Sequence, residues 1–329
     1  MILIAPHIAA FLQQRLPVEQ GASEHTRDSY SYAFQLLFEF ASKRLKISPS
    51  ALCLEQLDAP LILAFLEHLE SVRENSPRSR NVRLAAIKSF MHFIEHRVPS
   101  ALDQIHRVLA IPTKKTDLPV VCYLSTEEMQ ALIDVPDPTT RGGIRDRAML
   151  HLGFTAGLRV SELVGLRMDD MSFQSPITIL VHGKGRRQRL LPLCKESASA
   201  LRAWLAVRGQ ILVPEIFLNA RGHQMTRSGF EYILRKHVKT ALKRCSSLGG
   251  KRISPHKLRH TCAMAILQAT RDIRKVALWL GHASIQTTEI YTRADPLEKL
   301  DAVEAVTPPA LRRGRFQPSD KLMAMLKER

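Results

Sequence analysis

The chain of 329 residues carries 48 Lys and Arg against 31 Asp and Glu, which gives a formal net charge of +17 and a pI near 10.0. A single hydrophobic core stops growing below this length, so two domains are expected. The apolar fraction of 45% excludes a disordered chain, and the charge favours a polyanionic partner.

The positive charge is unevenly distributed along the sequence. Residues 1–110 hold 12 basic and 11 acidic side chains, whereas the remainder holds 36 and 20. A nucleic-acid-binding surface is therefore expected mainly in the C-terminal part. A basic, highly soluble protein without a polyanionic partner is the alternative at this point.

Cysteine usage and the N-terminal segment indicate the compartment. The five cysteines are scattered and form no C-x-x-C pair, which is typical of a reducing cytosol and argues against a disulfide framework. The N-terminal segment MILIAPHIAAFL is apolar but lacks a basic start and a small-residue cleavage site. It predicts a first amphipathic helix rather than a signal peptide, and no apolar run approaches a membrane span. We therefore expect a cytoplasmic protein.

Helical periodicity dominates the first hundred residues. Apolar residues share one helical face over 26–44, and a second helix is expected over 60–69. A third helix begins with Ser76 as N-cap and Pro77 at the first helical position, and it continues to about Ile94. Its other side is basic, and either simple solvation or DNA contact accounts for that face, which carries Arg78, Arg80, Arg83 and Lys88.

A proline-bounded polar stretch, IPTKKTDLP, separates these helices from the rest of the chain. The predicted domains are 1–112 and 120–329, joined by a linker at 113–119 whose Lys114 and Lys115 could follow a nucleic-acid backbone. A capping box at Ser125 or Thr126 then opens the next helix.

The second domain is predicted to be mainly helical with one antiparallel hairpin. Two short strands, ITILV (177–181) and RLLPL (189–193), flank the glycine-containing turn HGKGRRQ, which supplies Lys184, Arg186 and Arg187. An amphipathic helix follows from about Phe230 to Leu242. Its outer face is a second candidate DNA contact and carries Arg235, Lys236, Lys239 and Lys243.

The segment SPHKLRHTCAMAIL predicts a helix with Ser254 as N-cap and a buried stripe that includes Leu258, Cys262, Ala265 and Ile266. On a different face, His256, Arg259 and His260 lie three and four residues apart. His256 falls in the first turn, where backbone N–H groups favour an anion.

The pair of histidines four residues apart also invites a test for a metal site. Zinc hydrolases with this spacing place a general-base Glu after the first histidine, in the motif H-E-x-x-H. Here Lys257 occupies that position, and further basic residues flank both histidines. No metal is therefore expected.

Two further helix signals follow. Asp272 caps a helix that ends at Gly281, which places His282 in the turn. Ser284 is then expected to cap a helix that contains Tyr291. A lone tyrosine at such a position is usually a packing residue, so its neighbours decide its role.

Four segments, TAGLRVSEL, HGKGRRQRLLPL, HKLRHT and LGHASIQTTEIY, resemble the signature blocks of the tyrosine recombinase/integrase family in order and spacing. They span most of residues 125–293. The resemblance implies a helical core-binding domain followed by an α+β catalytic domain. It also implies site-specific DNA strand exchange through a 3′-phosphotyrosyl intermediate and a Holliday junction, without metal, ATP or another cofactor.

The resemblance also implies roles for individual residues. Arg159 and Arg259 would hold the scissile phosphate, and Tyr291 would attack phosphorus. His256 would act as general acid/base for the tyrosine proton.

Further roles follow from the same blocks. Lys184 would protonate the leaving 5′ oxygen, and His282 would hydrogen-bond the phosphate. Glu162, three residues after the first arginine, would orient the site, and His260 is interpreted as a supporting or structural histidine.

The implied partners are duplex DNA with specific recombination sites, a homotetramer with one dimer per site, and an accessory or directionality protein. The tail, 302–329, contains a short helix pattern with Leu322, Met325 and Leu326. This tail would either dock on a neighbouring protomer or remain solvated. Alternative functions are a non-catalytic architectural DNA-binding protein, strand relaxation like that of a type IB topoisomerase, and a metal-dependent nuclease.

Overall fold

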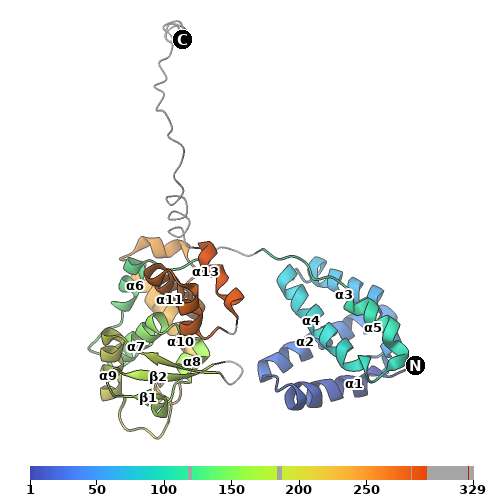
Figure 1. Cartoon of the computed structure of the whole chain (residues 1–329), viewed down its shortest axis with the longest axis horizontal. Helices are drawn as coiled ribbons and strands as arrows, with labels where there is room; N and C mark the ends of the chain where they lie inside the picture. Colours follow the sequence, from blue (N-terminus) through green and yellow to red (C-terminus); the bar gives the residue numbers. More distant parts are fainter. Residues whose placement is uncertain (118–120, 184–186, 283, 295–324, 326–329) are drawn as a thin grey trace. The chain divides into compact units, whose positions relative to one another are not determined.

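The computed structural model describes residues 1–117, 121–183, 187–282, 284–294 and 325. The chain divides into two compact units, Met1–Leu118 and Pro119–Arg329 (Figure 1). The finer limits of the predicted linker, 113–119, stay a prediction. No helix in the described ranges is long and apolar enough to cross a membrane.

The first unit is a helical bundle. Its helices are α1 (Ile4–Ala10), a π-helical continuation (Phe11–Glu19), α2 (Glu24–Leu45), α3 (Ala59–Ser71), α4 (Pro77–Glu95) and α5 (Leu102–Leu109), with 3₁₀ turns at Pro49–Ala51, Leu54–Gln56 and Pro99–Ala101. Aromatic rings from three of these segments meet in its core, where Phe11 lies edge-on to Phe34 and Phe90 at centroid distances of 6.1 and 5.5 Å. The predicted helices are confirmed, including the Ser76 cap of α4.

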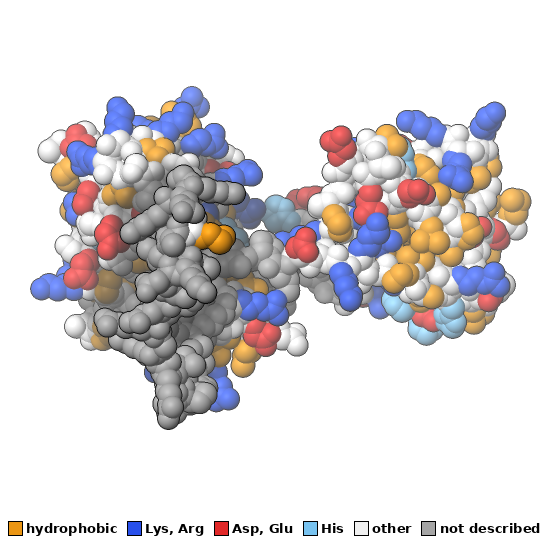
Figure 2. Space-filling view, turned by 90° about the horizontal axis from the view of Figure 1, so that it is seen from above, with side chains coloured by type: hydrophobic (Ala, Val, Ile, Leu, Met, Phe, Trp, Pro, Cys, Tyr) orange, Lys and Arg blue, Asp and Glu red, His pale blue; other side chains and the backbone are white. Residues whose placement is uncertain are grey.

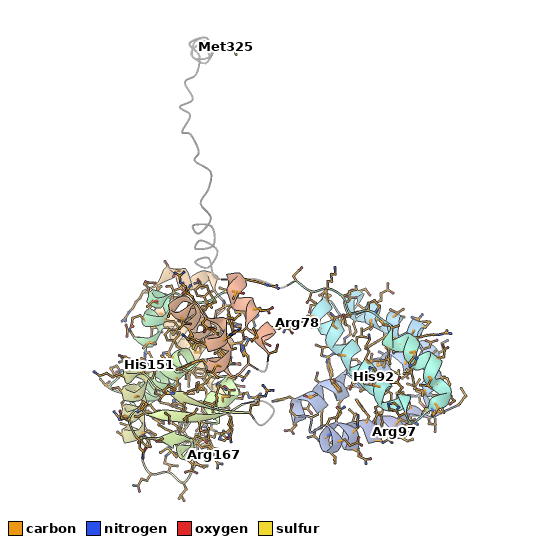
Figure 3. All side chains as sticks on the ribbon, in the orientation of Figure 1. Arg78, His92, Arg97, His151, Arg167 and Met325 are labelled. Atoms are coloured by element: carbon orange, nitrogen blue, oxygen red, sulfur yellow. The ribbon has the colours of Figure 1, made fainter. Side chains whose placement is uncertain are left out.

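The basic side of α4 differs from the sequence-based expectation at one position. Arg78 lies exposed in the first turn (Figure 3), but Arg80 is only 4% exposed. The Arg80 guanidinium donates to the Pro112 carbonyl oxygen over 3.0 Å, so it fastens the end of this unit to α4. The expected exposed position of Arg80 is therefore wrong, and we no longer assign it a DNA contact.

The second unit is mainly helical with a small sheet. Its helices are α6 (Thr126–Ile133), α7 (Arg141–Thr155), α8 (Val160–Val164), α9 (Lys195–Arg208), α10 (Arg227–Ala241), α11 (Pro255–Thr270), α12 (Ile273–Leu280) and α13 (Glu289–Ala294), with 3₁₀ turns at Met168–Asp170, Ser246–Gly250 and Ile285–Thr287. The predicted hairpin is confirmed as antiparallel β2 (Thr178–His182) and β3 (Gln188–Pro192), with Leu180 opposite Leu190. A two-residue strand, β1 (Met171–Ser172), pairs with β2 and was too short to predict.

Helix α11 is the central helix of the site and packs against α7, α12 and α13. Its predicted N-cap, Ser254, accepts a hydrogen bond from the Lys257 backbone N–H. The predicted buried stripe is wrong at Ala265, which is exposed, whereas Ala263 and Met264 are buried. Contacts on several sides widen and rotate the buried face beyond one amphipathic stripe.

The segment after His282 also differs from the prediction. Ser284 caps a 3₁₀ turn rather than an α-helix, and α13 begins only at Glu289. The predicted tail helix lies outside the described residues except for Met325, which is helical and exposed.

Candidate active site

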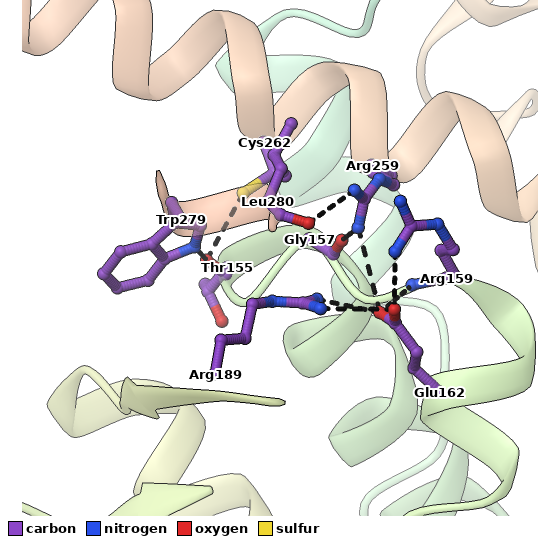
Figure 4. Close-up of polar contacts among 9 residues, drawn as sticks. All are labelled: Thr155, Gly157, Arg159, Glu162, Arg189, Arg259, Cys262, Trp279 and Leu280. Carbon is purple, nitrogen blue, oxygen red and sulfur yellow. Dashed lines mark hydrogen bonds and ion pairs between the residues drawn. The ribbon is translucent and has the colours of Figure 1, made fainter. Parts of the chain in front are cut away.

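The turn between α7 and α8 positions the first arginine. Gly157 adopts φ +58°, a conformation that favours glycine, and it redirects the chain after α7. Arg159 is then the N-cap of α8, and Glu162 reaches back to accept from the Arg159 backbone N–H over 2.9 Å. The Arg159 guanidinium also donates to Glu162 over 2.7 Å, so the motif TAGLRVSEL fixes arginine and glutamate together (Figure 4).

Arg259, from α11, is held at the centre of the same cluster and is 1% exposed. Its two terminal nitrogens donate to the carbonyl oxygens of Gly157 and Leu280, each over 2.7 Å, and one lies 3.8 Å from Glu162 (Figure 4). Burial, followed by the charge of Arg159, lowers the pKa of Arg259 to about 10. The guanidinium therefore remains charged at neutral pH, in a fixed orientation.

A third arginine, absent from the predicted site, completes this cluster. Arg189 on β3 donates to both carboxylate oxygens of Glu162, at 2.8 and 3.2 Å. Burial would raise the pKa of Glu162, but the hydrogen bonds and charge of Arg189, together with the hydrogen bonds of Arg159, bring it below its ordinary value. One ionised carboxylate is thus surrounded by three guanidinium groups, which leaves an excess of positive charge.

Gly281 carries the chain from α12 into the site. It adopts φ +64°, as the predicted helix end requires, and His282 follows directly. The His282 Nδ1 lies 2.8 Å from the hydroxyl of Thr288, a fully buried residue. Burial, followed by the charges of Arg259, Arg159 and Arg189, lowers the pKa of His282 to about 4, so the imidazole is neutral at pH 7.

Tyr291 lies inside a small cluster of apolar side chains from α11, α12 and α13 and is 1% exposed. Its ring is parallel to that of His282, with a centroid distance of 6.4 Å. Its hydroxyl oxygen lies 2.8 Å from Nδ1 of His260. Burial raises the pKa of Tyr291 to about 12, so the phenol is protonated at neutral pH.

The neighbour of the tyrosine hydroxyl is therefore His260 and not the expected His256. Burial, followed by the charges of His256 and Arg259, lowers the pKa of His260 to about 4. His256 is exposed one turn earlier on α11, with its ring centroid 4.2 Å from that of His260. The two histidines form a short row from the tyrosine toward solvent.

An open cleft of about 860 Å³ lies beside the arginine cluster and the turn that carries His282. It is lined from three directions by Arg159, by Arg187 and Arg189 at the hairpin, and by Gly281 and His282. A cleft with several guanidinium groups suits an anionic substrate such as a phosphodiester. Within the described ranges, no group of three or more His, Cys, Asp or Glu side chains is placed to hold a metal ion.

Comparisons with known proteins agree with this arrangement. The phage integrase family matches residues 123–298, and the phage integrase N-terminal SAM-like domain matches residues 8–97. A putative integrase/recombinase of Sinorhizobium fredii, y4rC, is 42% identical over 98% of this chain and 97% of its own length. The chain belongs to the phage integrase family of tyrosine recombinases.

Other relatives and solved structures support the same assignment. The tyrosine recombinase XerC of Myxococcus xanthus is 34% identical to this recombinase and aligns over 89% of this chain and 94% of its own length. The Tn1549 transposon integrase in complex with circular intermediate DNA has a TM-score of 0.65 and 15% identity, and the match covers 92% of this chain and 99% of the integrase chain. The XerH post-cleavage complex has a TM-score of 0.65 and 22% identity, and the match covers 87% of this chain and 81% of the XerH chain. At these identities the two structures show the shared fold.

The structure brings together most of the predicted site of this site-specific DNA recombinase. The site is formed by Arg159 and Glu162 at the start of α8, Arg259 from α11, His282 after α12 and Tyr291 from α13. Lys184 and Arg186 lie outside the described residues, although the Gly183 N–H donates to the Arg187 carbonyl oxygen over 2.7 Å next to them.

Two functional candidates were missed by sequence reasoning. Arg189 lies two residues before Leu191 on the same strand, so the two side chains point to the same face of the sheet. Because Leu191 is buried, the strand pattern already placed Arg189 on the inward face. Thr288 gives no such signal, because a threonine in a turn has no periodic context.

The predicted DNA-contacting residues are mostly exposed. The outer face of α10 is exposed as expected at Arg235, Lys236 and Lys239, and Lys243 just beyond its end is exposed too. In the first unit Lys88 is partly buried, and Arg83 lies over the Tyr32 ring and donates to the Ser29 carbonyl oxygen.

At the end of the first unit, Lys115 is exposed and Lys114 forms an ion pair of 2.8 Å with Glu70. On the face in Figure 2, both basic and acidic side chains are visible on each unit. The DNA contacts of all these residues stay predictions.

Proposed function

We propose that this recombinase cleaves and rejoins duplex DNA with Tyr291 as its nucleophile, at specific recombination sites in the cytoplasm. The observation that carries the proposal is the convergence of Arg159, Arg259 and His282 beside a buried tyrosine. XerH is described as bound to difH substrate, and a lambda integrase fragment as a dimer bound to a core site. We extend these partners to the present chain, as one dimer per site and a tetramer during strand exchange.

The chemistry begins with charge stabilisation. A phosphodiester carries one negative charge, and a second develops as the tyrosine oxygen adds to phosphorus. Arg159 and Arg259 supply charged donors that are already oriented by Glu162 and by backbone carbonyls. Such fixed donors contribute about 10²- to 10³-fold each to the rate, because they need no rearrangement as charge develops.

The nucleophile needs a proton acceptor. The Tyr291 hydroxyl donates to His260 Nδ1 in our proposal, and the adjacent exposed His256 passes the proton on. Phosphate binding adds negative charge beside both histidines, which raises their pKa values and favours proton uptake. The role first expected for His256 alone is thereby shared between the two histidines.

The covalent step conserves the phosphate ester. The bond from phosphorus to the 5′ oxygen breaks as the bond to the Tyr291 oxygen forms, which leaves a 3′-phosphotyrosyl link and a free 5′-hydroxyl. Lys184 is proposed to protonate the departing oxygen, and neutral His282 to donate to a non-bridging oxygen. A 5′-hydroxyl from the second duplex later attacks the same phosphorus, so no metal, ATP or other cofactor is needed.

A covalent-trap assay tests this proposal. Purified protein with EDTA is mixed with nicked duplexes from the flanks of its own gene and separated on a denaturing gel. Wild type should give a shifted protein–DNA band, and Tyr291→Phe should give none. Tyr232→Phe, which removes an exposed hydroxyl elsewhere in the same unit, should behave as wild type. An adduct that persists in Tyr291→Phe, or one that needs added metal, would contradict the proposal.

A further inference from the structure

Arg189 occupies a connecting position in the site. Its guanidinium binds both oxygens of Glu162, and the same two oxygens hold the backbone and the side chain of Arg159. The Arg189 side chain is only 11% exposed, so water offers little competition for this pair. A bidentate pair fixes the carboxylate plane as well as its position.

The same side chain packs against the other half of the site. A Cβ added to Gly281 would lie 3.0 Å from Arg189 Cδ and 3.2 Å from one of its terminal nitrogens. Gly281 directly precedes His282, so Arg189 fills the space beneath the turn that presents this histidine. One residue of β3 thus contacts both the Arg159–Glu162 pair and the end of α12.

The charge balance explains why this contact matters for Arg159. Without Arg189, the two oxygens of Glu162 would be left to Arg159 and Arg259. A stronger pull from Glu162 would turn the Arg159 guanidinium inward, although its side chain is now 36% exposed toward the cleft. Arg189 occupies the carboxylate and leaves donors of Arg159 available for a substrate oxygen.

We propose that Arg189 is a positioning residue for the cleavage reaction, which sets the orientation of Arg159 through Glu162 and supports the His282 turn through Gly281. This inference rests on the proposed function. It predicts that Arg189 affects the chemical step on bound DNA and acts through Arg159 rather than through a contact of its own with DNA.

The test compares single-turnover cleavage at saturating protein for wild type, Arg189→Met and Arg189→Lys. Methionine keeps an unbranched chain against Gly281 and removes both donors. Because a misplacement of about 1 Å can cost about 100-fold in rate, Arg189→Met should slow adduct formation by about that factor. Lysine keeps the charge but cannot bind both oxygens, so its rate should fall between the two.

Two readouts separate positioning from a general structural role. In an Arg159→Lys background, the added Arg189→Met change should slow cleavage less than about 5-fold. On a duplex whose scissile phosphate is replaced by an uncharged methylphosphonate, the loss caused by Arg189→Met should shrink likewise, since the clamped negative charge is absent. A purely structural defect would cost the same factor in both backgrounds and on both substrates.

Control variants complete the design. Arg208→Met removes a buried arginine that donates to carbonyl oxygens beyond the end of α9. It should lower the stability of the unit but leave the cleavage rate at saturating protein unchanged. Arg187→Met removes an exposed arginine of the same cleft and should act on DNA affinity. An undiminished rate in Arg189→Met, multiplicative losses with Arg159→Lys, or a change confined to DNA affinity would overturn the inference. Loss of the adduct in wild type would instead overturn the proposed function.

Discussion

Gly157→Ala should strongly destabilise the second unit, because two separate costs fall on one position. The residue has φ +58°, where an L-residue costs about 1–2 kcal/mol. An added Cβ would also lie 2.7 Å from Leu280 Cδ2 and 2.9 Å from Cys262 Sγ. Both neighbours are buried, so their side chains can shift only by displacing packed atoms, and such overpacking costs about 1–3 kcal/mol. We expect a total of about 3 kcal/mol.

The chain offers a selective probe for this measurement. Both tryptophans, Trp204 and Trp279, lie in the second unit, so tryptophan fluorescence in a urea titration reports that unit alone. In a thermal melt followed by the same fluorescence, a loss of about 3 kcal/mol corresponds to a decrease of roughly 10 °C in Tm for a unit of this size. The backbone turn also carries the carbonyl that binds Arg259, so the Gly157→Ala adduct rate should fall even where the unit stays folded.

Two glycines of the same unit provide matched controls. Gly222 has φ +81° with no atom within 4 Å of an added Cβ. Gly222→Ala should therefore lower the free energy of unfolding only by the cost of the positive φ, without a steric contribution. Gly142 lies within α7, also with open space and without a positive φ, so Gly142→Ala should stabilise by up to about 1 kcal/mol. If Gly157→Ala loses no more free energy of unfolding than Gly222→Ala, the steric reasoning fails.

Three further outcomes are expected. The folded-state pKa values of His260 and His282 are about 4 against an ordinary 6.5, so the unfolded chain binds more protons between these values. The free energy of unfolding of the second unit should therefore be highest above about pH 6.5 and fall as the pH decreases toward about 4. The urea midpoints of wild type at about pH 7 and pH 5 should differ, and this difference should be smaller in a His260→Asn/His282→Asn variant. Thr288→Val should slow cleavage about 10-fold by removing the partner of His282 Nδ1, whereas Thr292→Val, whose hydroxyl donates to the nearby Glu289 carbonyl oxygen, should not; equal rates would refute this role. Arg80→Met should speed tryptic cleavage after Lys114 about 10-fold because Pro112 is released, and exposed Arg78→Met should leave that cleavage rate unchanged; if both variants match wild type, the fastening role is wrong.

Local signals in the sequence predicted the helices well, because caps and periodicity act within a few residues. Ser76, Ser125 and Ser254 all cap helices where expected, and Gly281 ends α12. The failures have a common physical origin. Arg80 has a binding partner 32 positions away, and the widened buried face of α11 depends on three helices packing around it. Neither is encoded in a local pattern.

The site follows the same division between local and distant information. Arg159 and Glu162 are adjacent through a capping box, so a motif is sufficient to find them. The contact between Tyr291 and His260 joins residues 31 positions apart, and its partner could equally have been His256 one turn earlier on the same helix. Spacing alone cannot separate two histidines four residues apart, because both lie on one helical face. The packing of α13 on α11 makes the choice, since it sets the depth at which the phenol oxygen meets the helix. A buried hydroxyl without a partner would cost about 1–3 kcal/mol, so the fold that buries Tyr291 also requires a hydrogen-bonding group at His260. The same packing therefore stabilises the protein at rest and holds its proposed nucleophile beside a proton acceptor.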